Sequence, residues 1–148
     1  MTSAVETWIV VADGDGARVF EERRRLGPLV ERADLAVRSQ EDRHLISGRH
    51  GTVSGRQGHS QHATGMADPG SAAEARFLSG FAKGLDTAAD EGMFEHLVII
   101  APPEALGALR ASLKPSTRRR LEACDPHERH GEDAEALRMR LRTLRGVV

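Results

Sequence analysis

Short apolar stretches separated by turn residues fill the first forty positions of the chain. The apolar run 8–12 is followed by the letters DGDG at 13–16 and by a second short strand through residues 18–20, which is the pattern of a β-hairpin. A turn at 27–28 leads into a third stretch over 29–37. The pattern therefore predicts three strands arranged as an antiparallel meander.

Helical periodicity begins after residue 70. Ser71 with Glu74 three residues later forms a capping box, and Gly92 is a natural helix stop. Between them, apolar residues recur at helical spacing: Phe77, Phe81, Leu85 and Ala88. Gly80 and Gly84 lower helix propensity, and we infer that their lack of a side chain lets this helix sit close to a sheet.

An unbroken apolar run over Leu97–Ile100 indicates a strand that is covered on both faces and lies at the centre of a sheet. Pro103 then opens a helix, and Pro115 separates from it a second short helix that ends near Cys124. The last segment, 132–148, places leucines on one helical face and arginines on another, which predicts an amphipathic helix.

The length of 148 residues suits one domain with its own core and is too short for two ordinary domains. The order β-β-β-α-β-α-α predicts a single α/β domain over residues 1–148. Its mixed sheet would have four or five strands. The N-terminal antiparallel meander would join a central strand at 96–101, and helices would pack on the sheet.

Residues 38–71 interrupt this pattern, because Gly, Ser, His, Arg and Gln dominate and no periodicity appears. Loops of this length are usually functional or disordered. Little apolar material is present to offset the roughly 1–2 kcal/mol per residue of backbone entropy lost on ordering. We therefore expect a long mobile loop, most mobile at about 50–66 when no partner is bound.

Charged residues make up 29% of the chain, but the formal net charge is −1, so no overall field attracts nucleic acid or a membrane. Positive charge, nearly all of it arginine, must act through local patches. Two patches are expected, one at Arg118–Arg120 and one on a face of the C-terminal helix with Arg138, Arg142 and Arg145. His127 and His130 are expected to be exposed.

Cysteine content and hydropathy bound the location of the protein. The single cysteine excludes an internal disulfide and a cysteine-based zinc site. The N-terminus lacks the pattern of a signal peptide, and no apolar run is long enough to span a membrane. We therefore expect a cytoplasmic protein that does not insert into membranes.

The stretch GRHGTVSGRQGHSQHATG, residues 48–65, admits three interpretations: a metal-binding loop, a loop that meets nucleic acid, or a solvated loop without a role. Metal ligation would use His50, His59 and His62 with Asp68 as a fourth ligand. Zinc, however, needs a tetrahedral set whose ligands are oriented by further hydrogen bonds. We favour solvated histidines over a metal site and expect no cofactor.

The letters DGDG at 13–16 resemble the start of a calcium loop, but the twelfth position is Arg24, where calcium requires a bidentate glutamate. We interpret them as a tight turn in which the glycines supply positive φ. Asp13, at a strand end, is a candidate ligand for a divalent metal, as in nucleases of the ribonuclease H type. Ile100 is followed by Ala-Pro-Pro and no partner acid, which argues against a two-metal nuclease.

Two motifs carry a resemblance to a known family. They are TWIVVADGDGARVFE at 7–21 and FEHLVIIAPPEALGALRASL at 94–113, separated by the loop rich in arginine, glycine and histidine. From Thr7 to about Leu121 the chain resembles the bacterial family of proteins required for attachment to host cells. In the first motif, Asp13, Gly14 and Arg18 belong to the family pattern VADGxxARVF and mark the turn as a candidate site.

The family in turn resembles the middle domain of archaeo-eukaryotic peptide-chain release factors, an α/β fold related to ribonuclease H-like domains. In those factors a Gly-Gly-Gln loop between the meander and the next helix reaches the peptidyl-transferase centre of the ribosome. The corresponding letters here are Gly55-Arg56-Gln57-Gly58, in which arginine replaces the second glycine.

The resemblance implies a cytoplasmic domain, non-enzymatic or only vestigially enzymatic, that contacts the ribosome or RNA through loop 48–65. The contacting residues would be Arg49, His50, Arg56, Gln57, His59 and His62. Two alternatives stay open. One is a metal-dependent hydrolase that uses the loop histidines, and the other is a homo-oligomeric attachment or interaction module that uses the C-terminal helix.

Overall fold

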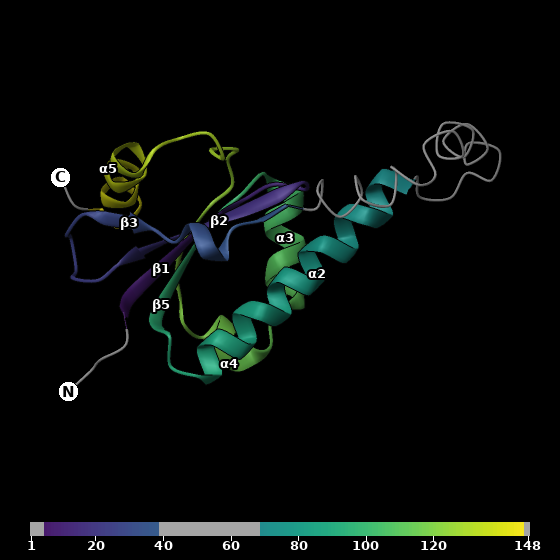
Figure 1. Cartoon of the computed structure of the whole chain (residues 1–148), viewed down its shortest axis with the longest axis horizontal. Helices are drawn as coiled ribbons and strands as arrows, with labels where there is room; N and C mark the ends of the chain where they lie inside the picture. The colour runs from purple at the N-terminus through teal and green to yellow at the C-terminus, as the bar shows by residue number, and fades with distance from the viewer. Residues whose placement is uncertain (1–4, 39–68, 147–148) are drawn as a thin grey trace.

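The computed structural model describes residues 5–38 and 69–146, in which six strands form one mixed sheet (Figure 1). The strands are β1 Val5–Ala12, β2 Gly16–Glu22, β3 Leu29–Glu31, β4 Val37–Arg38, β5 Phe94–Ile100 and β6 Leu121–Asp125. Their order is β3-β2-β1-β5-β6, and β4 pairs with the other half of β2. The meander is antiparallel, whereas β1, β5 and β6 run parallel.

The centre of the sheet is where the apolar runs predict it. β1 pairs with β5 in a register that places Trp8 beside Leu97 and Val11 beside Ile100. All of these side chains are buried. The predictions of a single α/β domain, a mixed sheet and a central strand near 96–101 are therefore confirmed for the part of the chain that the structure describes.

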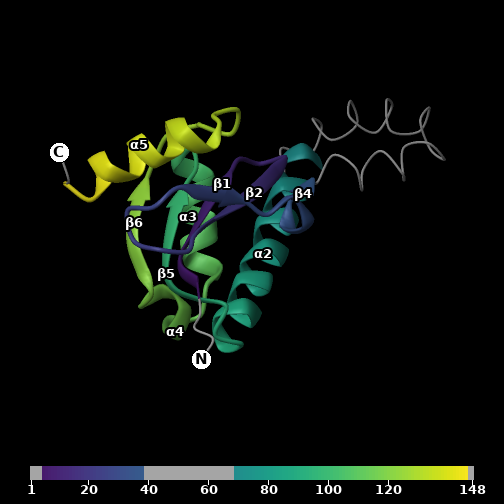
Figure 2. The same cartoon turned by 60° about the vertical axis from the view of Figure 1, so that its left-hand side comes forward.

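Helices cover both faces of the sheet. They are α2 Pro69–Asp90, α3 Pro103–Ser112, α4 Pro115–Arg118 and α5 Ala134–Leu144, with a 3₁₀ turn η1 at Ala33–Leu35. α2 and α3 pack on one face and α5 lies on the other (Figure 2). Alternate residues of β1 divide between the two layers, so Trp8 and Val10 face α2 and α3 while Ile9 and Val11 face α5.

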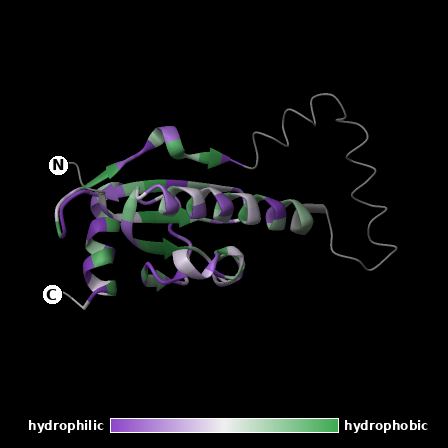
Figure 3. Ribbon diagram, turned by 90° about the horizontal axis from the view of Figure 1, so that it is seen from below, coloured by the Kyte–Doolittle hydropathy of each residue, from purple (hydrophilic) through white to green (hydrophobic). Residues whose placement is uncertain are grey.

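Hydropathy along the elements matches this layering. The central strands are predominantly hydrophobic, whereas α2 and α5 alternate between hydrophobic and hydrophilic residues along their length (Figure 3). On α5, the predicted stripe is confirmed, because Leu137 and Leu141 are buried and Leu144 is partly buried. Among the described residues, no helix has both the length and the apolar character needed to cross a bilayer.

The predicted short helix ending near Cys124 is wrong. α4 ends at Arg118, and residues 121–125 form strand β6 along the edge of β5. The physical reason is the crossover connection, since a helix that returns over a sheet after one parallel strand commonly leads to the next parallel strand. The half-buried residues of β6 carry too weak an apolar pattern to show this locally.

The third predicted strand, 29–37, is interrupted. β3 pairs with the end of β2 through residues 20–22, and β4 pairs with its start through Gly16 and Ala17. The 3₁₀ turn η1 separates the two pieces. With β6 added and this strand divided, the described sheet has six strands rather than four or five.

Three expectations about α2 are corrected or refined. The helix begins at Pro69, before the predicted cap at Ser71. Gly92 does end it, with φ of 74°. A Cβ atom added at Gly80 or Gly84 would meet nothing within 4 Å, so these glycines do not serve close packing on the sheet. Of the predicted stripe, Leu85 and Ala88 are buried in the core, while Phe77 and Phe81 are only partly buried. The other residues of α2 in the core are Leu78, Ala82 and Ala89.

The expected arginine patch on the last helix is also corrected. Only 3% of the Arg145 side chain is exposed, and its guanidinium donates to both carboxylate oxygens of Glu22 at 2.7 and 2.8 Å. It also donates to Glu122 at 2.9 Å. Arg145 is therefore part of a buried ion-pair network that ties the end of α5 to β2 and β6, and not part of a basic surface.

Candidate functional site

The carboxyl ends of the three parallel strands meet at one edge of the sheet. In open α/β sheets, ligands bind outside this edge. Asp13 directly follows β1, Pro102 follows β5, and Asp125 is the last residue of β6. We refer to the turn 13–16, the loop 126–133 and these strand ends together as the carboxyl edge.

The turn 13–16 is held by the side chain of Asp13. Its Oδ1 accepts hydrogen bonds from the backbone N–H of Asp15 at 2.8 Å and of Gly16 at 3.0 Å. The expectation of positive φ in this turn is wrong, because positive φ occurs in the described part at Leu26, Gly92 and Gly146. Limited space favours glycine at position 16 instead, where a Cβ would lie 3.1 Å from the carbonyl oxygen of Val37. A Cβ at Gly14 would meet only the movable end of the Glu74 side chain on α2.

Arg18 clamps the loop 126–133 onto the sheet. Its Nε and Nη2 donate to the two carboxylate oxygens of Glu31, each at 2.9 Å, and its Nη1 donates to the carbonyls of His130 at 2.6 Å and Glu132 at 2.9 Å. The guanidinium also lies over the ring of Phe20. The hydrogen bond from Arg18 lowers the pKa of Glu31. Arg18 therefore builds the site rather than offering a free cation.

Asp125 is the buried centre of a second set of contacts, with 1% of its side chain exposed. Its oxygens accept from His127 Nδ1 at 2.5 Å, Arg129 Nε at 2.8 Å and Arg140 Nε at 3.0 Å. Burial alone would raise the pKa of Asp125, but these hydrogen bonds outweigh burial and hold the pKa below its ordinary value. The carboxylate thus stays ionised and orients the His127 ring, which is 58% exposed.

His130 forms a second pair of carboxylate and imidazole groups at this edge. Its Nδ1 lies 3.9 Å from Asp13 Oδ2, which is an ion-pair distance and too long for a hydrogen bond. The expectation of an exposed His130 is wrong, because only 28% of its side chain is exposed and its Nε2 is buried, without a hydrogen-bond partner among the described residues. The ring lies beside Gly16, where a side chain would have contacted it.

A pocket of about 340 Å³ adjoins the turn, between Gly14, the start of α2 and the start of α3. Glu74 and Glu104 line it. The unpaired backbone N–H groups at the start of α3 would attract an anion, but these two carboxylates oppose one. The pocket therefore does not favour a phosphate.

The segment 39–68 leaves and re-enters the described structure at the carboxyl edge. Arg38, the last residue before it, is paired with Gly16 in the sheet, and Glu74, just after it, contacts the position of Gly14. The predicted binding residues themselves lie outside the described residues: Arg49, His50, Arg56, Gln57, His59, His62 and the alternative ligand Asp68. The structure therefore places the two ends of this segment but none of those side chains.

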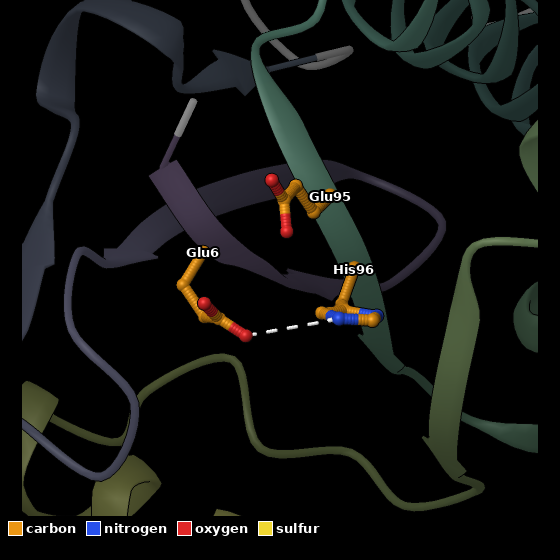
Figure 4. A group of neighbouring side chains, drawn as sticks. All are labelled: Glu6, Glu95 and His96. Atoms are coloured by element: carbon orange, nitrogen blue, oxygen red, sulfur yellow. Dashed lines mark ion pairs between the residues drawn. The ribbon is translucent and has the colours of Figure 1, made fainter. Parts of the chain in front are cut away.

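One group with metal-ligand chemistry occurs in the described part, at the opposite edge of the sheet. Glu6 of β1 and Glu95 and His96 of β5 each offer a ligand atom, all within 4.8 Å of one another. Figure 4 shows the Glu6 carboxylate facing the His96 ring, with Nε2 and Oε2 3.7 Å apart. Arg25 also reaches this carboxylate, at 3.6 Å, and would compete with a cation. These residues differ from the histidines considered in the loop.

Sequence reasoning identified the turn but missed its partners. Asp125, His127 and His130 join Asp13 and Arg18 only in the folded chain. The letters CDPHERH at 124–130 were a usable signal, because two histidines and two acids close to a strand end are typical of a site. Because residues 115–124 are expected to form a helix, the sequence pattern does not show that these letters follow a strand, and the signal is missed.

Comparison with known proteins places this edge in a family. A search of curated proteins found no match. A family profile described as "Protein required for attachment to host cells" matches residues 8–141. The match extends beyond Leu121, where the resemblance seen in the sequence ends, and includes β6, the loop 126–133 and most of α5. Because the match spans most of the described fold and the whole carboxyl edge, the chain belongs to the family of proteins required for attachment to host cells.

Proposed function

We propose that this member of the host-attachment family is a cytoplasmic binding domain, related to the middle domain of release factors, that contacts ribosomal RNA at its carboxyl edge. Residues 48–65 supply the contacts in this proposal. The arginines Arg49 and Arg56 meet phosphates, and Gln57 and the histidines meet sugars and bases.

The observation that carries the proposal is the position of the two ends of segment 39–68. Arg38 is paired with Gly16, and α2 contacts the same turn through Glu74. The described residues on either side of the segment therefore lie at the edge where α/β folds bind ligands. The proposal is also supported by the resemblance to release factors, in which the glutamine-bearing loop lies between the meander and the next helix.

The described part of the edge acts as a rigid support in this proposal. Its arginines are already matched by acids, with Arg18 on Glu31 and Arg129 on Asp125 and Glu132. Such paired cations have little charge left for phosphates. In this proposal the arginines of the segment contact the phosphates, and His127 offers an exposed ring for hydrogen bonding at the carboxyl edge.

Co-sedimentation of the full chain with ribosomes over a range of salt concentrations tests this proposal. We expect association at low salt that weakens steadily as salt rises. The double variant Arg49→Ala and Arg56→Ala should weaken association. It should also reduce the slope of the logarithm of the binding constant against the logarithm of the salt concentration, by about one for each lost phosphate contact. Arg119→Ala, which removes an exposed arginine beside α4 at the opposite edge, is the matched control and should have no effect.

No association at low salt would exclude the proposal. Association that depends on Arg119 and not on the loop arginines would show that the ribosome binds at the opposite edge of the sheet, which would contradict the proposal. Stoichiometric zinc that is lost in His62→Ala would favour the metal-dependent hydrolase instead. A stable oligomer that dissociates when the exposed Met139 of α5 is replaced would favour the oligomeric module.

A further inference from the structure

An open apolar groove runs along α2, on the side of the molecule away from α5. It has a volume of about 540 Å³, within the range of sites that take small molecules. α2 forms one wall with Phe77, Gly80, Phe81 and Gly84, and Leu35 and Val37 lie on the other. The site residues of the carboxyl edge do not line it, so it lies outside the proposed ribosomal contact.

The two glycines hold this groove open. Both are exposed, both are inside a regular helix, and neither has positive φ. Because a Cβ at either position meets nothing within 4 Å, the fold itself has no steric need for glycine there. Glycine is nevertheless among the least favourable residues in a helix interior. What these glycines provide is space along the wall of the groove.

The groove has chemically different ends. Val37 pairs with Ala17, which in turn pairs with Ala12, so Val37 lies level with Ala12 in the sheet. Ala12 is four residues along β1 from Trp8, a distance of about 13 Å. Val37 and Trp8 therefore line opposite ends of the groove. Arg76 lines the Val37 end, two residues after the Glu74 that contacts Gly14, and makes no ion pair with any described residue. Glu91, near the other end of α2, gives the Trp8 end a negative charge.

Trp8 is the second sign of a ligand. Only 4% of it is exposed, it lines the groove, and its indole N–H is buried without a hydrogen-bond acceptor in the described part of the chain. Buried donors are nearly always paired, since an unpaired one loses its hydration without compensation. An oxygen atom supplied from the groove would satisfy it.

We propose that the groove binds an elongated aliphatic carboxylic acid that carries a hydroxyl or carbonyl oxygen at its far end. The carboxylate pairs with Arg76 and the chain lies along the glycines of α2. The far oxygen accepts from the Trp8 N–H. Glu91 repels a carboxylate from the Trp8 end and so sets the direction of binding.

Fluorescence titration of the full chain tests this inference directly. The chain contains one tryptophan and no tyrosine, so its emission reports on this groove alone. The probes are 12-hydroxydodecanoate, dodecanoate and dodecanol below their aggregation limits. We expect the hydroxy acid to bind roughly threefold to tenfold more tightly than dodecanoate, because one hydrogen bond is added. Dodecanol can place its hydroxyl against Trp8 but has no charge for Arg76, so it should bind roughly twofold to fivefold more weakly than the hydroxy acid. The two probes that carry a hydroxyl should shift the indole N–H resonance strongly, and dodecanoate should not.

Two variants and a matched control complete the test. Gly84→Leu fills the groove and should abolish saturable binding. Gly107→Leu, also at an exposed helix position with open space, lies on α3 outside the groove and should bind as the parent does. Arg76→Gln should weaken the two acids by roughly twofold to fivefold, as expected for an exposed ion pair, and leave dodecanol unchanged.

Several outcomes would overturn the inference. Emission that does not respond to any of the three probes would show that the groove does not take this class of molecule. Binding that survives Gly84→Leu in a folded protein would place the ligand elsewhere. A dimer that Gly84→Leu converts to a monomer would show that a second copy, and not a small molecule, fills the groove.

Discussion

At the scale of single residues, the strongest constraint is the buried contact between Arg145 and Glu22. The two side chains are 3% and 1% exposed and share two hydrogen bonds, and the backbone N–H of Leu26 donates to the same carboxylate. Burial would raise the pKa of Glu22, but the hydrogen bonds from Arg145 and Leu26 outweigh it and the pKa is lowered. The buried Glu22 carboxylate therefore depends on Arg145 for its compensating charge, whereas Arg145 also pairs with Glu122.

Removing one member should be costly for this reason. Arg145→Ala leaves Glu22 as an uncompensated buried charge, and we expect the free energy of unfolding to fall by about 3–5 kcal/mol. Arg145→Lys keeps the charge but cannot form the bidentate hydrogen bonds to Glu22, so the free energy of unfolding should fall by a smaller amount. Denaturant unfolding measures both. A loss below about 1 kcal/mol for Arg145→Ala would place this pair among the weak surface contacts.

At the scale of elements, α2 shows how one helix serves two purposes. One face enters the core through Leu78, Ala82 and Leu85, while the adjacent face carries Gly80 and Gly84 beside the open groove. The helix ends at Asp90, and Gly92 follows it with a positive φ that suits glycine. The three glycines thus have different physical roles within one segment.

Alanine substitutions should separate these roles by the sign of their effect. Gly80→Ala and Gly84→Ala relieve a helix-interior penalty without a clash, and each should stabilise the protein by about 0.5–1 kcal/mol. Gly92→Ala should destabilise it by about 1–2 kcal/mol, because an L-residue is strained at a φ of 74°. Thermal unfolding of the three variants checks this. If Gly84→Ala destabilises the protein instead, the result would support the close helix–sheet contact expected from the sequence.

The loop 126–133 is a second element whose order depends on a distant residue. Arg18 donates to two of its carbonyls from β2. In Arg18→Gln these carbonyls lose their partner, and we expect faster amide hydrogen exchange in 126–133 with little change in β1 or β5. Arg23→Gln, which removes an exposed arginine of the same chain region, is the control. Equal exchange in parent and variant would show that Asp125 alone holds the loop.

At the scale of the whole molecule, ion pairs join the layers that the hydrophobic cores define. Glu22 and Glu122 bind the end of α5 to the sheet, and Asp125 binds the same helix through Arg140. For each of these carboxylates, burial opposes ionisation and hydrogen bonds from arginine or histidine overcome it, so the pKa is lowered. The α5 layer is thus attached by groups that are charged at neutral pH.

Acid should therefore weaken the fold. Each of these groups has a folded-state pKa below its unfolded value of about 4, so its contribution is complete above that value and is lost as pH falls through the folded-state pKa. We expect the free energy of unfolding to drop steeply below about pH 4. Asp125→Asn should destabilise the protein at pH 7, and the difference from the parent should shrink by pH 3. A constant difference across this range would mean that the charge of Asp125 contributes nothing.

The sequence by itself determined the elements whose signal is local. The apolar runs of β1 and β5, the proline start of α3, and the leucine face of α5 are patterns of neighbouring residues, and each element formed where expected. The two motifs also sufficed to recognise the family, which the profile match confirms. These features need no knowledge of what lies across the fold, because backbone conformation and burial at such positions follow from residues a few places apart.

Tertiary structure decided what depends on residues far apart in the chain. β6 is a strand because the edge of β5 offers it hydrogen bonds, not because its own pattern demands it. Arg145 is buried because Glu22, 123 positions earlier, lies beneath it. The same holds for the meeting of Asp13 with His130, and for glycines that were expected to bring α2 close to the sheet and that line an open groove instead. The energies of such contacts arise from proximity created by folding, and a one-dimensional pattern carries no record of that proximity.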